Sequence, residues 1–406
     1  MKSSSIMFVL FVFFLLPGCG GGGSSSSTSS QTANVLALTV NGSTCDSSIG
    51  PYMNEPCVSV TVCTPNTSTC VTINGILLDT GSYGLRIFKQ ALGSVSLTQL
   101  ASGSGSLAEC VQYADGTADW GPVQTASVVL GNESAVQVPI QVIDYKFPTV
   151  AVADSVCPGS DQTPSDTGFN GILGVGPFDQ DCGSTCVNSS VGQYYTCSGS
   201  QCSGTTVLLS NQVSNPVAAL PTDNNGLIVE LPTVAAGGAA SVTGSLVLGI
   251  GTESNNSSAG VTVYTVDQND EFATTFSGVT YADVPPNYSG SFIDTGSNGL
   301  YFPSPTSGTY NGELPDCGGV NSGFFCPSST TNFSATITGA SGSPTGTVPF
   351  SIGNFNTLAK SGNNVFSDIG ANSPGFDWGL PFYFGRNVFI GFENPSNPGT
   401  GQYFAY

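Results

Sequence analysis

One seven-residue pattern occurs twice in this chain and restricts its fold more than any other feature. Asp79-Thr-Gly-Ser-Tyr-Gly-Leu85 returns as Asp294-Thr-Gly-Ser-Asn-Gly-Leu300, with six of the seven residues identical and a spacing of 215 residues. An apolar run precedes each copy. This spacing is far too long for a solenoid, whose repeats span roughly 20–50 residues. It predicts two lobes with one copy each, which we place at residues 34–205 and 206–406.

Short strand-like segments with turn residues between them recur along both predicted lobes. Helical periodicity is confined to two short stretches, residues 88–92 and 206–217. The pattern therefore predicts an all-β fold with few short helices. The clearest predicted strands are residues 58–62, 128–130, 136–142, 261–264 and 335–337.

The charged residues limit the chemistry that this chain can perform. It contains no histidine, which excludes Ser–His and Cys–His catalytic pairs and any zinc site with histidine ligands. It has 26 acidic and only 6 basic residues, so it repels phosphate and is not expected to bind nucleic acid or anionic lipid. Hydrolytic chemistry would therefore depend on carboxylates. We expect the scarce cations Arg86 and Arg386 to pair with buried carboxylates.

The N-terminus has the features of an exported, anchored protein. A basic start and an apolar run over residues 6–16 are typical of a secretory signal, and the run is too short to span a membrane. Residues 16–19 resemble a bacterial lipobox ending in Cys19, which would carry the lipid. We therefore predict a lipoprotein signal peptide at residues 1–18 and a Gly/Ser tether at 19–33. Gly20 after Cys19 resembles the sorting pattern of outer-membrane lipoproteins. The alternative is an ordinary cleaved signal with an incidental cysteine.

The other twelve cysteines form an even set, which in an exported chain predicts up to six disulfides. Two pairs bracket short loops and are plausible local bridges, namely Cys63/Cys70 and Cys317/Cys326. A second group could instead form a four-thiolate zinc site, although its spacing is not that of a zinc ribbon and the compartment favours disulfides. That group contains Cys182, Cys186, Cys197 and Cys202.

The repeated motif has a direct chemical interpretation. The apolar strand anchors the carboxylate, the glycine allows a second backbone to approach, and the hydroxyls supply hydrogen bonds. If the two turns meet, Asp79 and Asp294 lie side by side, and like charges about 3 Å apart share one proton. One carboxylate can then activate water while its protonated partner hydrogen-bonds the substrate carbonyl. This chemistry needs no cofactor and no metal.

The two Asp-Thr-Gly-Ser motifs resemble the paired active-site loops of the pepsin-like aspartic proteases. The resemblance implies a bilobal pepsin-like double β-barrel fold with few short helices, and a catalytic pair formed by Asp79 and Asp294. It also implies supporting roles within each loop. Thr80 and Thr295 would brace the loops against each other, Ser82 and Ser297 would hydrogen-bond the carboxylates, and Gly81 and Gly296 would complete the turns.

Other segments resemble the same proteases in the same order. Residues 111–117 are similar to the flap hairpin, with Tyr113, Gly116 and Thr117 as flap or substrate residues. Residues 169–174 resemble the strand that supports the first loop, and 244–249 a strand that opens the second lobe. Residues 378–392 are similar to the closing segment, except that Pro381 stands where a supporting glycine is expected. Arg86 also departs from the pattern, because a tryptophan usually follows the first loop.

The layout is closer still to an uncharacterised bacterial family of aspartic-protease-like lipoproteins. The shared signatures are Asp-Thr-Gly-Ser-x-Gly-Leu-Arg, a cysteine-rich middle and Phe-Asp-Trp-Gly-Leu-Pro-Phe. That family carries no established activity, so a functional assignment depends on the two aspartates.

We expect a monomeric, lipid-anchored aspartic endopeptidase that hydrolyses polypeptides at the bacterial cell envelope. One alternative is a catalytically silent lipoprotein of the same fold that binds peptide or glycan. Another is a glycosidase with two carboxylates, which is disfavoured because such enzymes do not need matched Asp-Thr-Gly loops.

Overall fold

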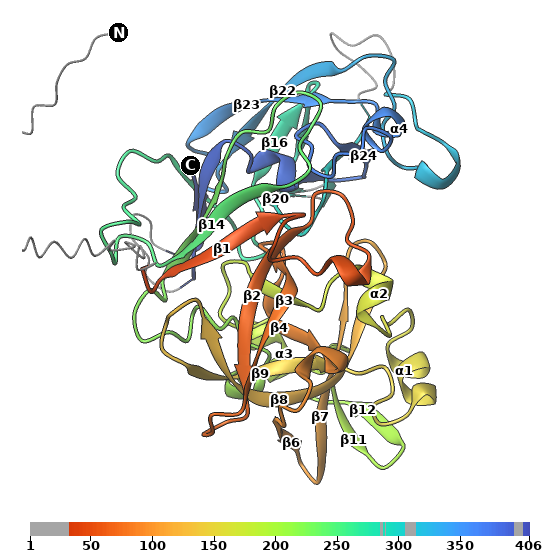
Figure 1. Ribbon diagram of the computed structural model, residues 1–406, viewed down its shortest axis with the longest axis vertical. Coiled ribbons are helices and arrows are strands. Elements are labelled where there is room, and N and C mark those ends of the chain that lie inside the picture. The colour runs from red at the N-terminus through yellow and green to blue at the C-terminus, as the bar shows by residue number, and fades with distance from the viewer. Residues whose placement is uncertain (1–31, 285–286, 289, 305–313, 394–400) are drawn as a thin grey trace, which may run out of the picture. The chain divides into compact units, whose positions relative to one another are not determined.

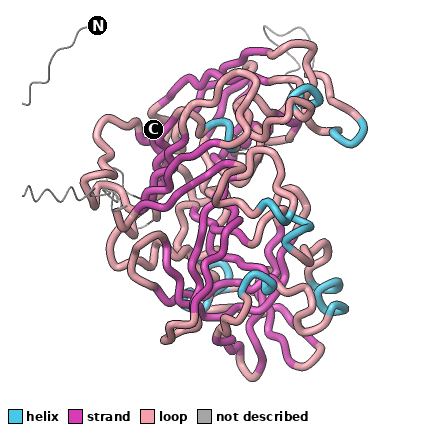
Figure 2. The backbone as a smooth tube through the Cα atoms, viewed as in Figure 1, coloured by secondary structure: helices cyan, strands magenta, loops and turns pink. Residues whose placement is uncertain are grey.

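The chain folds mostly into β-strands with a few short helices, as a computed structural model shows (Figures 1 and 2). The structure describes residues 32–284, 287–288, 290–304, 314–393 and 401–406. Each of the five strand segments predicted above overlaps an observed strand, because alternating apolar residues bury one face of the sheet. The predicted signal peptide, Cys19 and most of the tether lie outside the described residues.

The strands of the described chain have the following bounds. The first twelve are β1 (Val35–Val40), β2 (Pro56–Cys63), β3 (Cys70–Asp79), β4 (Tyr83–Phe88), β5 (Thr98–Gln99), β6 (Ala101–Ser102), β7 (Gly105–Gln112), β8 (Ala118–Leu130), β9 (Val136–Ile143), β10 (Gly171–Val175), β11 (Tyr194–Ser198) and β12 (Gln201–Gly204). The others are β13 (Gly226–Leu231), β14 (Val242–Leu248), β15 (Val263–Thr265), β16 (Ala273–Phe276), β17 (Val279–Tyr281), β18 (Asp283–Val284), β19 (Asn287–Tyr288), β20 (Ser291–Ile293), β21 (Leu300–Phe302), β22 (Thr331–Thr338), β23 (Thr345–Ile352), β24 (Gly370–Asn372), β25 (Phe376–Trp378), β26 (Arg386–Gly391) and β27 (Tyr403–Ala405).

The helices are short. The α-helices are α1 (Val150–Val156), α2 (Pro164–Thr167), α3 (Gly183–Asn188) and α4 (Phe355–Leu358), and the 3-10 helices are η1 (Ser47–Ile49), η2 (Lys89–Leu92), η3 (Leu209–Asn211), η4 (Gly319–Asn321) and η5 (Leu380–Phe382). The helix predicted at 88–92 is present as η2. The helix predicted at 206–217 is wrong beyond η3, because the next backbone amides bond elsewhere. Ser214 N donates to Pro139 O and Asn215 N to Asp179 O, which holds this segment extended.

Six strands close a mixed barrel around the first motif. β2 pairs with β3 and β8, β8 with β9, β9 with β4, β4 with β10, and β10 with β3. The β3–β10 and β4–β9 pairs are parallel, and the other four are antiparallel. Their inward apolar side chains belong to the main core, in which Leu78, Leu85 and Leu173 are fully buried. This core anchors the strand that ends at Asp79.

The second motif has the same local strand order as the first. Around the first motif the order is β3-β10-β4-β9, and around the second it is β20-β25-β21-β24. In both sets the first and second strands are parallel, the second and third antiparallel, and the third and fourth parallel. The second set is an open sheet within the described residues, and a separate sheet has the order β17-β16-β22-β23. Among the residues that the structure describes, one barrel is therefore found, rather than the two that we expected.

Strands from both predicted lobes share a sheet. β1 pairs with β14 along its whole length, from Val35 opposite Val247 to Val40 opposite Val242 (Figure 1). β14 in turn pairs with β13, and β13 with β26. Residues 33–406 accordingly form one compact unit.

All twelve cysteines after Cys19 are paired in disulfides, which confirms the predicted even set. The local bridges Cys63–Cys70 and Cys317–Cys326 are present. The four cysteines considered for zinc instead form two disulfides, Cys182–Cys186 and Cys197–Cys202, so the zinc interpretation is wrong. The remaining bridges are Cys45–Cys57 and Cys110–Cys157. Six disulfides indicate an exported protein, because they persist in oxidising compartments. None of the helices in the described residues is long and apolar enough to cross a membrane.

Candidate functional site

The two Asp-Thr-Gly-Ser loops meet face to face. Asp79 is the last residue of β3, and Asp294 follows β20 directly. A Cβ atom on Gly81 would come within 2.7 Å of the Asp294 carboxyl carbon, and one on Gly296 within 2.8 Å of Asp79 Oδ1. Each carboxyl group is thus seated against the glycine of the opposite loop. No larger residue fits there without separating the loops.

The hydrogen bonds around the two carboxyls follow the repeat. Gly81 N donates to Asp79 Oδ1 at 2.8 Å, and Gly296 N donates to Asp294 Oδ1 at 2.7 Å. The Ser82 hydroxyl donates to Asp79 Oδ2 at 2.5 Å. The Ser297 side chain, at the matching position, lowers the pKa of the Asp294 carboxyl. The two carboxyls face the same glycine, since a Cβ atom on Gly296 would lie 2.8 Å from Asp79 Oδ1 and 3.1 Å from Asp294 Oδ1. The structure therefore brings together the aspartates, glycines and serines that the sequence singled out.

Thr80 and Thr295 join the loops through the backbone. Thr80 N donates to Thr295 Oγ1 and Thr295 N donates to Thr80 Oγ1, both at 3.0 Å. Thr295 Oγ1 also donates to Leu78 O at 2.7 Å. Both side chains are fully buried. Thr80 Oγ1 lies a further 2.7 Å from the Tyr383 hydroxyl, a contact that the sequence did not indicate.

Equivalent strands support the two loops from behind. Gly174 of β10 lies opposite Asp79, and Asp294 N donates to Trp378 O at the end of β25. Gly379 follows Trp378 and occupies the place of Gly174. A Cβ atom there would come within 2.6 Å of Ser297 O. The expectation that Pro381 replaces the supporting glycine is therefore wrong by two residues, since Pro381 lies beyond this strand, in η5.

The electrostatics favour a single shared proton. Burial raises the pKa of Asp294 well above its usual range, and the nearby carboxylates of Asp79 and Asp377 raise it further. The Ser297 hydrogen bond opposes this increase. A negative charge on a neighbouring carboxylate therefore favours the protonated form of Asp294.

Four tyrosines surround the pair. Burial raises the pKa of each, and the negative charge of the aspartates contributes to the increase, so all four stay neutral. Tyr83 also packs edge-on against Phe178, with ring centroids 4.9 Å apart. Sequence reasoning missed these residues, since single tyrosines carry no motif. They are Tyr52, Tyr83, Tyr301 and Tyr383.

The predicted flap is a hairpin formed by β7 and β8. Tyr113 N donates to Thr117 O at 2.9 Å, and Gly116 closes the turn with a φ of +89°. The Tyr113 hydroxyl donates to Asp119 Oδ2 at 2.8 Å, within the same hairpin. Burial raises the pKa of Tyr113, and Asp79 is among the charges that contribute. Gly116 and Thr117 thus shape the turn, and Tyr113 lies within electrostatic range of the pair.

Arg86 is buried beneath the first loop and is ion-paired as expected. Its Nη2 atom lies 2.8 Å from Asp181 Oδ2 and 3.3 Å from Glu109 Oε1. Its Nη1 atom donates to Tyr83 O at 2.6 Å, directly after the motif serine. The guanidinium therefore ties the end of the loop to the interior of the first half.

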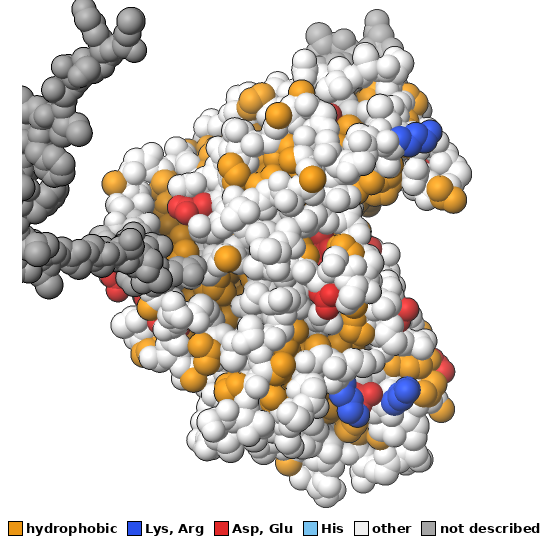
Figure 3. All heavy atoms as spheres, in the orientation of Figure 1, with side chains coloured by type: hydrophobic (Ala, Val, Ile, Leu, Met, Phe, Trp, Pro, Cys, Tyr) orange, Lys and Arg blue, Asp and Glu red, His pale blue; other side chains and the backbone are white. Residues whose placement is uncertain are grey.

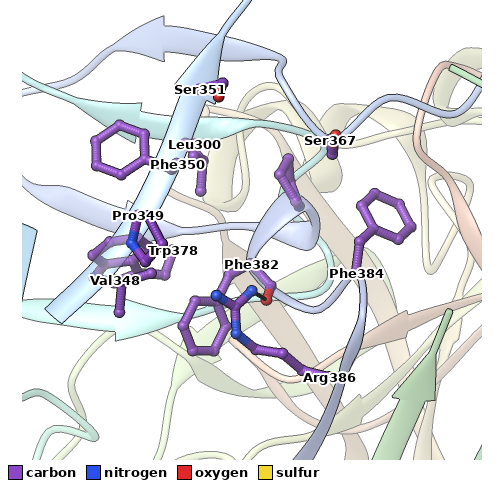
Figure 4. Close-up of a pocket in the computed structure, with 11 residues that line it drawn as sticks. Leu300, Val348, Pro349, Phe350, Ser351, Ser367, Trp378, Phe382, Phe384 and Arg386 are labelled. Atoms are coloured by element: carbon purple, nitrogen blue, oxygen red, sulfur yellow. Dashed lines mark hydrogen bonds between the residues drawn. The ribbon is translucent and has the colours of Figure 1, made fainter. Parts of the chain in front are cut away.

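Arg386 behaves differently from our expectation. Among the described residues no carboxylate lies within ion-pair distance of it. The guanidinium carbon lies 4.8 Å from the centre of the Phe382 ring and 5.7 Å from that of Tyr406. It faces a cavity of about 260 Å³ that Trp378 and Val348 also line (Figure 4). Basic side chains are scarce on the face shown in Figure 3.

Within the described parts of the chain, two groups of residues have a spacing that could suit a metal ion. In one, Cys45 and Cys57 are joined as a disulfide and have no thiolate to offer beside Glu55. In the other, Asp267, Glu271 and Asp283 form a partly exposed acidic turn. Asp267 Oδ1 there already accepts the backbone N–H of Asn269 at 2.8 Å. An acidic turn describes this second group better than a metal centre does.

Comparison with known proteins places the whole described chain in one family. No curated protein matches it in sequence. The family model described as a protein of unknown function, DUF3443, matches residues 30–406, and the chain therefore belongs to that family.

Proposed function

We propose that this protein is an aspartic endopeptidase that hydrolyses peptide bonds with Asp79, Asp294 and a water molecule. The observation that carries the proposal is the close approach of the two carboxyls, each of which is seated against the glycine of the opposite loop. The charge of Asp79 accordingly raises the pKa of Asp294. Carboxyls that share a proton can act as a general base and a general acid at the same time.

The proposal gives a different role to each aspartate. Asp79, as carboxylate, takes a proton from water while the water oxygen attacks the carbonyl carbon of the substrate. Asp294 gives the shared proton to the carbonyl oxygen, which forms a tetrahedral diol. The C–N bond then breaks as the amine takes the proton from Asp79 and the diol returns one proton to the aspartates. The pair ends with one proton, as it began.

The matched strand orders around the two motifs support a bilobal pepsin-like arrangement. A bilobal protein of that superfamily would have the same strand order around each of its two loops. The orders found here are β3-β10-β4-β9 and β20-β25-β21-β24. The β7–β8 hairpin with Tyr113 would act as the flap over the substrate. Membership in a family of unknown function neither adds to this assignment nor conflicts with it.

The cellular setting is part of the proposal. Six disulfides support export. A lipid on Cys19, followed by a Gly/Ser tether, would hold the enzyme at the cell envelope, with an outer-membrane location suggested by Gly20. The substrate would be polypeptide within reach of that surface.

The carboxyl contact also bears on the alternatives. In glycosidases that act with two carboxylates, these groups lie about 5–9.5 Å apart. The close approach of Asp79 and Asp294 does not match that arrangement. A silent protein of the same fold that binds peptide or glycan would keep this geometry, so only an assay separates it from an enzyme.

The test is cleavage of casein and of a peptide library between pH 3 and pH 7. Asp79→Asn and Asp294→Asn should each reduce cleavage by a factor of about 10² or more, because each removes a proton-transfer group. Asp316→Asn, at an exposed acid of the same chain, is the matched control and should cleave normally. Cleavage that survives both active-site changes rules out the pair. A folded wild type that binds peptide without cleaving it favours the silent binding protein.

A further inference from the structure

Arg386 is a half-buried cation with no carboxylate within ion-pair distance among the described residues. The other arginine, Arg86, is held by Glu109 and Asp181. Within the described chain the Arg386 side chain makes one hydrogen bond, from Nη1 to Phe382 O at 2.5 Å, although a guanidinium has five N–H donors. Burial lowers the pKa of Arg386, as expected for a cation without a nearby carboxylate. In a protein with 26 acidic residues, a cation in this position needs an explanation.

The guanidinium of Arg386 lies at the wall of the cavity of about 260 Å³ between β23, η5 and β26 (Figure 4). Of the eleven described residues that line this cavity, eight are apolar, two are serines and none is acidic. The Arg386 side chain runs over the Phe382 ring, 4.8 Å from its centre, toward Trp378 and Val348 (Figure 4). The cavity therefore has a positive local charge, whereas the whole chain has a formal charge of −20. This charge favours an anion as the ligand.

The walls and the volume of the cavity limit the kind of anion that fits. A guanidinium matches the planar shape of a carboxylate and can bind it through two parallel hydrogen bonds. The rings of Trp378 and Phe382 offer an apolar surface to the rest of the ligand. An engineered cavity of about 150 Å³ holds benzene. The volume of about 260 Å³ therefore suits one ring, or a short chain, with a carboxylate attached. Inorganic phosphate has no apolar part to cover these rings.

The cavity is separate from the two aspartates and adjoins the structure that supports one of them. None of the described residues that line it belongs to the Asp-Thr-Gly-Ser residues 79–82 and 294–297. Leu300, at the end of the second motif, and Trp378 both line it. The carbonyl of Trp378 accepts the backbone N–H of Asp294 at 3.1 Å. A ligand in this cavity lies behind the second loop and leaves the two carboxyls free for substrate.

We propose that this cavity binds a small organic carboxylate, with its carboxylate on Arg386 and its apolar body against Trp378 and Phe382. A free aromatic or aliphatic acid offers this chemistry, and so does the C-terminal residue of a peptide. The inference goes beyond the proposed function and does not depend on it, because Arg386, Trp378 and Phe382 take no part in the proposed reaction.

The first experiment compares three ligands on the wild-type protein by titration calorimetry at pH 7. Phenylacetate should bind at least about tenfold more tightly than phenylacetamide, which keeps the ring but has no charge, because a hydrogen bond to a charged group contributes at least this factor. It should also bind at least about tenfold more tightly than acetate, because burial of the ring contributes a similar factor. Phenylacetate that binds no better than phenylacetamide overturns the proposal, and so does phenylacetate that binds no better than acetate.

A second experiment locates the binding site. Arg386→Met should remove the preference for phenylacetate over phenylacetamide, whereas Arg386→Lys should keep part of it, since an ammonium retains the charge but not the planar fork. Lys360→Met removes an exposed cation elsewhere and is the matched control, which should bind as the wild type does. A preference that survives Arg386→Met, or that Lys360→Met also removes, contradicts the assignment to this cavity.

A third ligand distinguishes the two sources of the carboxylate. N-acetylphenylalanine carries the ring and the carboxylate of a peptide C-terminus. If it binds to the wild type more tightly than phenylacetate, and Arg386→Met removes that binding, the cavity takes the end of a peptide. If it binds more weakly than phenylacetate, the cavity takes a free acid. Both results support the proposed carboxylate site, and the absence of binding by either ligand overturns it.

Discussion

Thr80 and Thr295 each donate a backbone N–H to the hydroxyl of the other, at 3.0 Å in both directions. This reciprocal pair joins residues 215 positions apart and sets the distance between the two carboxyls that precede them.

Thr80→Val keeps the shape of the side chain but leaves the Thr295 N–H buried without an acceptor. We expect a loss of about 1–3 kcal/mol in the free energy of unfolding, measured by urea denaturation. Thr80→Ser should lose much less. Thr61→Val removes a hydroxyl pair with Thr72 that is exposed to water, and should cost about 0.5 kcal/mol or less. Equal losses at Thr80 and Thr61 would contradict a bracing role.

Arg86→Met should be among the most destabilising substitutions in the first half. It leaves Glu109 and Asp181 buried without their counter-charge, which costs about 3–5 kcal/mol in comparable buried pairs. Arg386→Met is the control, since it breaks none of the described ion pairs. It removes ring contacts worth about 1 kcal/mol and one hydrogen bond to Phe382 O. Chemical denaturation of both variants gives the comparison. Adding Glu109→Gln to Arg86→Met should recover part of the loss, and a further decrease would argue against uncompensated charge as its cause.

Asp119 makes the flap hairpin sensitive to pH. Burial raises the pKa of Asp119 to about 7, partly offset by the Tyr113 hydrogen bond. Because the folded pKa exceeds the unfolded value of about 3.9, the stabilising contribution is complete below pH 4 and is lost as the pH rises through 7. Thermal unfolding of Asp119→Asn should show a shallower decline in Tm between pH 4 and pH 7. Unchanged slopes would mean that Asp119 ionises as freely in the folded protein as in the unfolded chain.

The Cys110–Cys157 disulfide joins the flap hairpin to the end of α1 across 47 residues, whereas Cys63–Cys70 spans only 7. Loop-closure entropy predicts losses of about 4 and about 2.5 kcal/mol when each pair is replaced by alanines. Denaturation of the two double variants under oxidising conditions measures both values. A larger loss for the short loop would show that local packing, rather than chain entropy, dominates.

Much of the fold followed from local pattern. The predicted strands, the even cysteine set and the ion pair of Arg86 depend on neighbours or on simple chemistry, and they are present in the structure. The segment after Leu209 was misread as a helix, because its amides bond to residues distant in sequence. The strand behind Asp294 was misplaced by two residues, because Gly379 can be recognised only from what lies opposite it.

The sequence by itself determined that two equivalent carboxylates end two apolar strands, because a repeated motif of this length is a local property of the chain. Only the tertiary structure decided that these carboxyls meet, that Thr80 and Thr295 hold the two loops together, and that a further acid, Asp377, lies on the strand paired with the one that precedes Asp294. Contacts across 215 residues depend on strand pairing and on the close approach of two backbones at Gly81 and Gly296, and neither can be read from the residues one at a time.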